Sequence, residues 1–530
     1  MNKGNITEKT PNIFGDRSFN ISFITLLLLH ILVIINTSLF PFADVPSHLA
    51  EGTIFRYYGS DTNNFNEYYT LHYLLYPNTF HLFFFSLPIF SSVETANRFL
   101  HLISIISLPI LVYFIIYEIK GNKWFAIASL VLVYNYNITF GFTGNAIAND
   151  LMLVILWLWL RIVNSNKYHF IYMLGISILL IGIYFMHAMV ALFCVLMLAT
   201  FLLYRYNNIR KLLLNSFCLI PLGILIINWW FVLQKSAENS VSYGSKDVST
   251  LAFMKEYYLH DFWLTYLSRG RFLVVDNSPL FDGLFGKVVG LLFSLIILIP
   301  LLLLIYNFIF RKYYKFNFSY KKENKLHYIV IFLLINIICY FFLPSKIPGQ
   351  EPIYERFSTT LLIALLFIAS KIPEANKKFL TYAAIIIASC HLILWTQYLM
   401  QFNRENEAFA QILPQDNSKV LSFMNYDPAY RGRMMYDHFQ NYFIVKKQGI
   451  ATSRIIDYRF GMIRRKESGG LPPQNYMYND DNPRALLKKS DYILIRGTIS
   501  SNHQRILDSL NTFRLVRNVQ NWHLLKRKSN

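Results

Sequence analysis

The residues best suited to chemistry lie in one short segment, FPFADVPSHLAEG, at residues 40–52. It places Asp44, His48 and Glu51 at positions i, i+4 and i+7. If the chain is helical after Pro46, His48 and Glu51 lie on one face of that helix. A carboxylate in a partly desolvated pocket can act as a general base, and histidine is a common partner in such sites. The alternative interpretation is that Asp44 is a helix N-cap and His48 a solvated loop residue.

A second segment, FGFTGNAIAND at residues 140–150, ends in an acid. Asp150 is expected at the start of a long apolar run, where an ionisable side chain usually faces the protein interior and marks a functional position. A cap on that helix is the alternative. His187 lies at the turn between two later apolar runs, and either substrate binding or interfacial packing accounts for it.

A third segment, PSKIPGQEPIYERFSTTLL at residues 344–362, contains Tyr354, Glu355 and Arg356. An arginine at the mouth of an apolar run is well suited to bind a phosphate through two parallel hydrogen bonds. The alternative is an arginine that extends to the interface and pairs with a neighbouring glutamate. Arg98 and Arg269 are further cations that could support an anion on the same side.

The elements that must position these residues are membrane helices. The chain has 530 residues, of which 54% are hydrophobic and 15% charged, whereas about 25% are charged in a typical soluble domain. Apolar runs near 20 residues long recur, and each matches a hydrocarbon layer of about 30 Å. The sequence therefore predicts an all-α polytopic membrane domain of about eleven spans. These are 20–40, 97–117, 124–140, 147–163, 168–186, 188–204, 211–233, 284–310, 326–343, 354–371 and 378–400.

Loop charge decides the sidedness. The block at 71–90 is ambiguous because it contains His72, Pro77 and His81, which are unfavourable in lipid. If this block does not span, the short basic loops fall on the cytoplasmic side, as positive charge normally does. We therefore expect 71–90 to be an interfacial helix within an outer loop, in a multi-pass protein of the inner, cytoplasmic membrane with its N-terminus in the cytoplasm. The net charge of +20 is then explained by the basic loops on the cytoplasmic side. The expected partners are membrane lipids rather than nucleic acid.

The last part of the chain differs in character. Residues 420–426 and 490–497 are typical of buried strands, and the segments around them of helices, so residues 401–530 are predicted to form a small α/β domain after a membrane domain at 1–400. That domain would be extracytoplasmic, with a long loop at 469–483. The sequence contains no Walker A loop, dinucleotide turn, HExxH or CxxC motif, so nucleotide-driven transport lacks support.

This layout resembles the GT-C superfamily, the polytopic glycosyltransferases that use polyprenyl-phosphate-linked sugars, such as protein mannosyltransferases and aminoarabinose transferases. In that family an aspartate follows the first span, within a long outer loop with interfacial helices, and a second acidic motif often follows the third span. Asp44 and Asp150 match these two positions. ETANRFLHLISIISLPILVY (94–113) and IKGNKWFAIASLVLV resemble the second and third spans. The resemblance covers most of residues 1–165.

The resemblance implies an inverting glycosyltransferase that moves a hexosyl or pentosyl unit from a polyprenyl-phosphate-linked donor to a glycan, lipid or protein in the cell envelope. Asp44 would be the general base, and Asp150 and Glu51 would assist it. Arg356, with Arg98 or Arg269, would stabilise the departing phosphate. The remaining substrate-binding candidates are His48, His187, Tyr354 and Glu355. The resemblance establishes no cofactor; Asp150, Glu51 and His187 would either orient the acceptor or hold a divalent metal ion.

A different class of function uses the same scaffold without catalysis. A lipid-handling or translocating protein also has many spans, but transporters commonly place their charges at mid-membrane depth. In this sequence the notable polar residues gather near one interface, which favours interfacial chemistry over passage across the bilayer.

Overall fold

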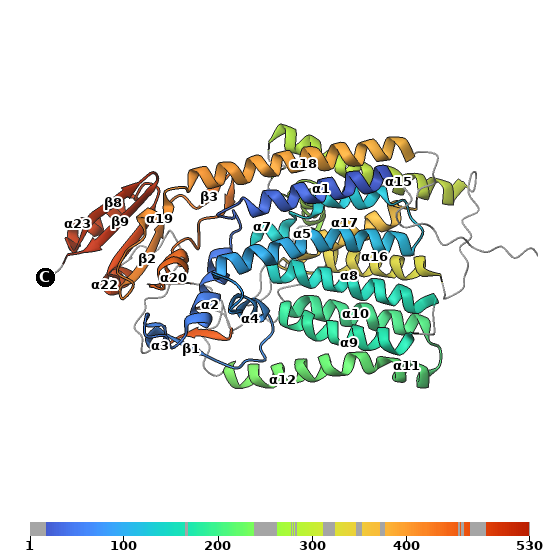
Figure 1. Cartoon of the computed structure of the whole chain (residues 1–530), viewed down its shortest axis with the longest axis horizontal. Helices are drawn as coiled ribbons and strands as arrows, with labels where there is room; N and C mark the ends of the chain where they lie inside the picture. The colour runs from blue at the N-terminus through green and yellow to red at the C-terminus, as the bar shows by residue number, and fades with distance from the viewer. Residues whose placement is uncertain are drawn as a thin grey trace, which may run out of the picture.

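The computed structural model describes residues 17–164, 168–237, 262–276, 278, 280, 283–310, 324–345, 352–371, 377–453, 456, 461–466 and 484–528. Within them, nine helical stretches are long and apolar enough to cross a membrane, so the chain is a multi-pass membrane protein. They comprise α1 (Arg17–Ile35), α5 (Val93–Glu118), α8 (Thr143–Asn164), α9 (His169–Met186), α10 (Ala188–Arg205), α11 with η2 and α12 (Ile209–Asn215, Ser216–Leu219, Ile220–Ala237), α15 (Leu284–Phe310), α16 (Lys325–Phe342) and α18 (Lys377–Glu405). They run side by side in one bundle (Figure 1).

Two further predicted spans are built differently from the continuous helices that the sequence indicates. The run 124–140 is divided into α6 (Trp124–Ala128), η1 (Ser129–Leu132) and α7 (Tyr136–Phe140). The Asn135 side chain accepts hydrogen bonds from the amides of Asn137 and Ile138, which starts a new helix inside the run. The run 354–371 is a short helix, α17 (Ser358–Ala369), preceded by the 3-10 turn η5 (Tyr354–Phe357).

The loop after α1 holds α2 (Val45–Tyr57), α3 (Phe65–Tyr68), β1 (Tyr69–Leu71) and α4 (Phe80–Phe85). The prediction that 71–90 does not span is confirmed, because α4 has only 6 residues and rises about 9 Å, far less than a hydrocarbon layer. The helix is shorter than we expected for an interfacial helix over the whole block. Asn78 fixes the preceding turn through its side chain, which accepts from the amide of Ala188 at 2.9 Å.

The C-terminal part forms the predicted small α/β domain around a five-stranded sheet of order β5-β2-β7-β9-β8. The two predicted strands are β2 (Val420–Asn425) and β7 (Tyr492–Arg496), which pair in parallel at its centre. The others are β5 (Ile450–Ala451), β8 (Phe513–Val519) and β9 (Trp522–Arg527). The helices are α19 (Phe409–Ile412), α20 (Asn441–Lys447), α22 (Arg484–Lys489) and α23 (Ser501–Leu510). The predicted loop 469–483 lies outside the described residues.

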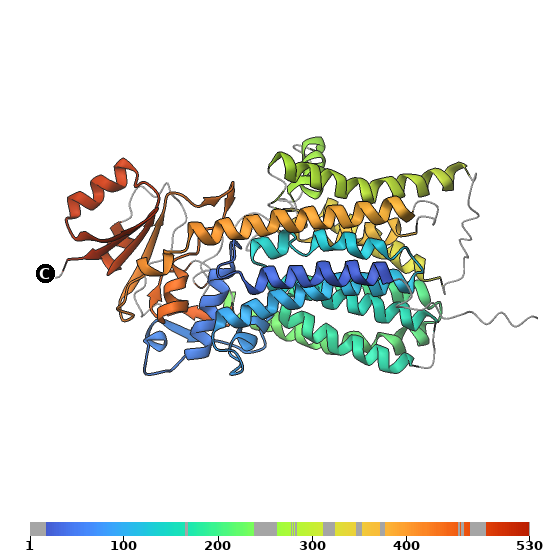
Figure 2. The same ribbon diagram turned by 45° about the horizontal axis from the view of Figure 1, so that its top comes forward.

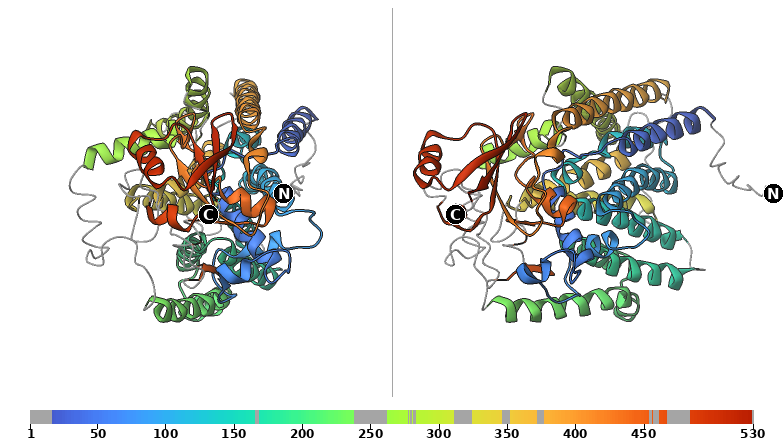
Figure 3. Two further views of the ribbon diagram at one scale, coloured as in Figure 1. Left: turned by 90° about the vertical axis from the view of Figure 1, so that its left-hand side faces the viewer. Right: turned by 60° about the vertical axis from the view of Figure 1, so that its left-hand side comes forward.

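The C-terminal domain lies at the same end of the bundle as α2 and α4 (Figures 1 and 2). β1 pairs antiparallel with β6 (Ile463–Arg465), and Asn441 of α20 donates to Ser47 of α2 at 2.9 Å. The left panel of Figure 3 looks at the molecule from this end, with the sheet in front of the bundle. At the opposite end, Lys371 donates to the carbonyl of Ile119 at 2.7 Å. Among the described residues, the basic segment around Lys371 therefore lies at the end opposite the C-terminal domain, as the loop charges predict.

Candidate functional site

Asp44 stands at the N-terminus of α2 but does not act as a cap. The helix begins at Val45 with a proline in its first turn, which suits the missing amide of proline. The Asp44 side chain makes no capping hydrogen bond to α2. Its Oδ1 instead lies 3.4 Å from Nε2 of His438, in the C-terminal domain. The buried carboxylate is thus directed away from its own helix, and a histidine reaches it from the other domain.

A close backbone approach fixes the position of Asp44. Its amide donates to the carbonyl of Phe140 at 3.0 Å, at the end of α7. Gly141 follows in a left-handed conformation with φ of +96°, and a Cβ there would stand 2.7 Å from the Asp44 nitrogen. Only glycine combines that φ with that clearance. The segment 140–150 therefore contributes to the site through its backbone.

The end of α7 connects the acid to the cation. Phe140 accepts from the Asp44 amide at 3.0 Å, and its ring stacks on that of Phe142, over which the Arg356 guanidinium lies at 4.0 Å. Tyr136 of the same helix is buried, and Glu355 and Arg433 are near enough for their charges to act on its hydroxyl. Arg433 belongs to β4 (Arg433–Met434), which pairs with β3 (Ala429–Tyr430) in the C-terminal domain. Three regions that are far apart in the sequence thus converge here.

Arg356 is held by a stack and a hydrogen bond. Its guanidinium lies 4.0 Å above the ring of Phe142, and Nη1 donates to Nε2 of His187 at 2.6 Å. Asn145 continues the series, with its Nδ2 3.3 Å from Nδ1 of His187. Asn137 donates to the Arg356 carbonyl at 3.1 Å. The planar cation is therefore oriented before any ligand arrives.

Arg269, Tyr354 and Glu355 form an adjoining group. The Arg269 guanidinium lies 4.1 Å from the Tyr354 ring centre, and its Nη1 donates to the carbonyl of Tyr340 at 2.8 Å. Glu355 accepts from the Ser345 hydroxyl at 2.7 Å, and burial raises the pKa of that carboxyl although this hydrogen bond and the charge of Arg269 oppose the rise. A second buried cation, stacked on Tyr354, therefore lies next to the segment that carries Glu355 and Arg356.

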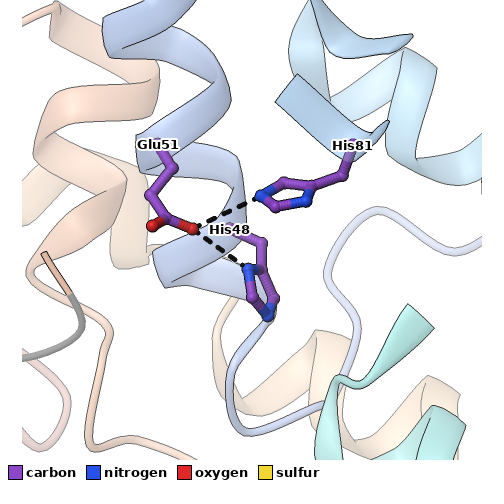
Figure 4. A group of neighbouring side chains, drawn as sticks. All are labelled: His48, Glu51 and His81. Carbon is purple, nitrogen blue, oxygen red and sulfur yellow. Dashed lines mark hydrogen bonds and ion pairs between the residues drawn. The ribbon is translucent and has the colours of Figure 1, made fainter. Parts of the chain in front are cut away.

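His48 and Glu51 share a face of α2, as their spacing predicts, and His81 of α4 joins them (Figure 4). Oε2 of Glu51 lies 3.2 Å from Nδ1 of His48 and 3.4 Å from Nε2 of His81. Burial opposes ionisation of Glu51, but the hydrogen bonds from both histidines outweigh it and hold the pKa of that carboxyl well below its usual range. Within the described part of the chain, these three residues are the one group of histidine, cysteine and acidic side chains close enough to hold a metal ion.

Two candidates have different surroundings. Asp150 lies two turns inside α8, because the helix begins at Thr143 rather than at the predicted 147, and it accepts from the Ser107 hydroxyl of α5 at 2.7 Å. Seven residues of helix separate it from Thr143 by about 10 Å along the axis. Arg98 of α5 donates to the carbonyl of Thr37 at 3.1 Å, at the end of α1. Glu51, Asp150 and His187 thus have separate neighbours rather than one shared centre.

Four residues of the site escaped the sequence analysis: Tyr136, His81, Arg433 and His438. His81 was noted as unfavourable in lipid, and that same signal marks a segment free to carry polar chemistry. Arg433 and His438 carry no local signal, since they reach Asp44 and Tyr136 only through the docking of the C-terminal domain.

Comparisons with protein-family models and with characterised proteins give no match. Among solved structures, the chain is similar to an oligosaccharyltransferase of Archaeoglobus fulgidus, solved in complex with Zn and sulfate. The two share 14% sequence identity with a TM-score of 0.43, over 90% of this chain and 68% of the other. An identity and a TM-score this low establish neither a shared fold nor a shared activity. The fold and the proposed activity of this chain are therefore argued from its own residues.

Proposed function

We propose that this protein is a membrane glycosyltransferase that moves a sugar from a polyprenyl-phosphate-linked donor to an acceptor hydroxyl or amine. The observation that carries the proposal is that one segment, Phe140–Phe142, contacts both a buried acid and a buried cation: Phe140 accepts from the Asp44 amide at 3.0 Å, and the Arg356 guanidinium lies 4.0 Å from the Phe142 ring centre. Glycosyl transfer from a phosphate needs one group to take a proton and another to receive negative charge. Both lie here, at the end of the spans where a lipid-linked phosphate would sit.

Asp44 is the proposed base. Its carboxylate makes no capping hydrogen bond to α2 and lies 3.4 Å from His438 of the C-terminal domain. It can therefore contact a ligand between the two domains. In the reaction Asp44 removes the acceptor proton while the acceptor oxygen or nitrogen bonds to the anomeric carbon. The bond from that carbon to the donor phosphate breaks, and its electron pair leaves with the phosphate. Attack opposite the leaving group inverts the anomeric carbon.

Arg356 is the proposed phosphate ligand, supported by Arg269. The stack on Phe142 and the bond to His187 fix the plane of its guanidinium, so little reorganisation is needed as charge grows on the leaving group. Tyr354 stacks on the Arg269 guanidinium at 4.1 Å, and the Tyr340 carbonyl accepts from that guanidinium at 2.8 Å, which together hold Arg269 in place. By sidedness, this chemistry takes place on the extracytoplasmic face.

The C-terminal domain is the proposed cover of the site. His438 and Arg433 reach the membrane domain from it, and β1–β6 pairing and the Asn441–Ser47 bond keep it in place. An acceptor glycan, lipid or protein then enters between this domain and the first loop.

The decisive experiment is Asp44→Asn in membranes supplied with a panel of labelled polyprenyl-monophosphate and polyprenyl-diphosphate sugars. Loss of a general base is expected to lower transfer by about 10²–10⁴-fold. The matched control is Asp61→Asn, an exposed aspartate in the same loop, which should transfer like the parent. Transfer by Asp44→Asn at the parental rate would remove the base. No transfer by the parent with any donor would favour the non-catalytic lipid-handling alternative.

A further inference from the structure

We propose that His48, Glu51 and His81 form a zinc site with three protein ligands and one open position. Two imidazoles and one carboxylate are the ligand types zinc prefers, whereas magnesium and calcium prefer oxygen ligands throughout. This site is separate from the transfer chemistry assigned to Asp44 and Arg356, so it stands or falls independently of the proposed function.

The distances between the donor atoms fit a tetrahedral ion. Zinc binds histidine nitrogen and carboxylate oxygen at about 2.0–2.2 Å, so neighbouring ligands of a tetrahedral site stand about 3.3–3.6 Å apart. Oε2 of Glu51 lies 3.2 Å from the His48 nitrogen and 3.4 Å from the His81 nitrogen. All three donor atoms lie within 4.8 Å of one another. Figure 4 shows both rings directed at one carboxylate oxygen.

The two helices that carry the ligands are held together independently of a metal. Gly52 allows α4 to lie directly against α2, since a Cβ there would stand 2.5 Å from the Phe85 ring. Arg56 of α2 donates to the carbonyls of Phe85 and Phe90 at 3.4 and 2.8 Å, which anchors the end of α4. One turn before Phe85, His81 is therefore presented to Glu51. A site assembled before the ion arrives costs little to order on binding.

An ion can reach this site from outside the core. The Glu51 side chain is 7% exposed, but those of His48 and His81 are 17% and 16% exposed, so the two imidazoles are the more accessible side of the site. A site with three protein ligands leaves its fourth position to water or to an oxygen of an anionic ligand. His48 follows Asp44 by one helical turn, because its amide donates to the Asp44 carbonyl at 3.2 Å. The ion would therefore lie beside the proposed acceptor entrance.

The test is the metal content of the full chain. The purified protein in detergent is incubated with ZnCl₂, freed of unbound ion by gel filtration and analysed by elemental mass spectrometry. About one zinc per chain is expected for the parent. His81→Gln and Glu51→Gln should each weaken zinc binding by at least about tenfold, the lower limit seen when even outer partners of a ligand are removed. His72→Gln, an exposed histidine in the same loop, is the matched control and should keep the zinc.

Substitution with Co²⁺ gives a second readout that does not depend on the variants folding. Co²⁺ bound in a tetrahedral site of the parent should absorb strongly in the visible range. The absorption should disappear when zinc displaces the cobalt. Three results would each overturn the proposal. They are a parent protein that retains no zinc, a His81→Gln variant that retains as much zinc as the parent, and a parent that binds iron in place of zinc.

Discussion

The two ends of the helix bundle use charge differently. At the end remote from the C-terminal domain, Glu118 of α5 binds two permanent cations, Arg161 of α8 at 2.9 Å and Lys325 of α16. At the other end, Asp44 lies beside His438 and Arg356 donates to His187. Histidine exchanges protons near neutral pH, whereas arginine and lysine stay charged. One end therefore uses permanent ion pairs to hold helices together. At the other end, the acid and the cation each lie beside a histidine.

After Asp44→Asn, the largest effect is expected at the phosphate ligand. Arg356→Gln should lower transfer by about 10²–10³-fold, because it removes a preorganised donor from the developing charge. Arg356→Lys should recover only part of this, since an ammonium lacks the planar fork and the stack on Phe142. Labelled-sugar transfer in membranes measures both, with Arg404→Gln, an exposed arginine of α18, as the control. Equal transfer rates for Arg356→Gln and the control would show that Arg356 does not stabilise the leaving group, so the two ends of the bundle would not differ in this respect.

The next effect concerns the backbone contact that positions Asp44. Gly141→Ala combines a left-handed φ with a Cβ placed 2.7 Å from the Asp44 nitrogen, whereas Gly59→Ala has the same kind of φ, +79°, and nothing within 4 Å. The φ alone costs about 1–2 kcal/mol in each variant, and the clash adds about 1–3 kcal/mol at Gly141. Thermal unfolding in detergent should show the difference, with transfer lost only in Gly141→Ala. Matching melting points for the two variants would contradict the close approach.

At the opposite end, Glu118→Gln should change stability and leave transfer unchanged. The substitution leaves Lys325, 15% exposed, without its carboxylate, while Arg161, 46% exposed, can return to water. We expect a loss of about 1–3 kcal/mol in the free energy of unfolding, below the cost of breaking a fully buried pair. Thermal unfolding measures this against Glu67→Gln, an exposed control. A drop in transfer at unchanged stability would show that the remote end takes part in the chemistry.

The smallest effect is expected at His438. His438→Gln keeps a polar side chain beside Asp44 but removes the imidazole that lies 3.4 Å from its carboxylate, so transfer should fall by about tenfold, close to 1.4 kcal/mol. If His438 positions Asp44, the pH dependence of transfer should also shift between parent and variant. If the pH profile of transfer is the same in the parent, in His438→Gln and in His438→Asn, His438 serves only in the packing between the two domains.

Much of the site lies where local sequence rules place it. Asp44 stands at the start of a helix because Pro46 follows it, and His48 and Glu51 meet because residues three apart share a helical face. The failure of 71–90 to span follows from its prolines and histidines. Asp150 was misplaced in depth, because nothing local announced that α8 would begin at Thr143, directly after the left-handed Gly141.

The sequence by itself determined the membrane class, the segregation of basic loops to one end and the local pairing of His48 with Glu51, because hydropathy and helical spacing act over a few residues. The tertiary structure alone decided which groups meet across the chain. His438 reaches Asp44, and His81 reaches Glu51, through the docking of separate elements. The Asn441–Ser47 bond that helps to fix this docking joins residues 394 positions apart. No periodicity records such a contact, since it depends on the packing of a whole domain against the bundle.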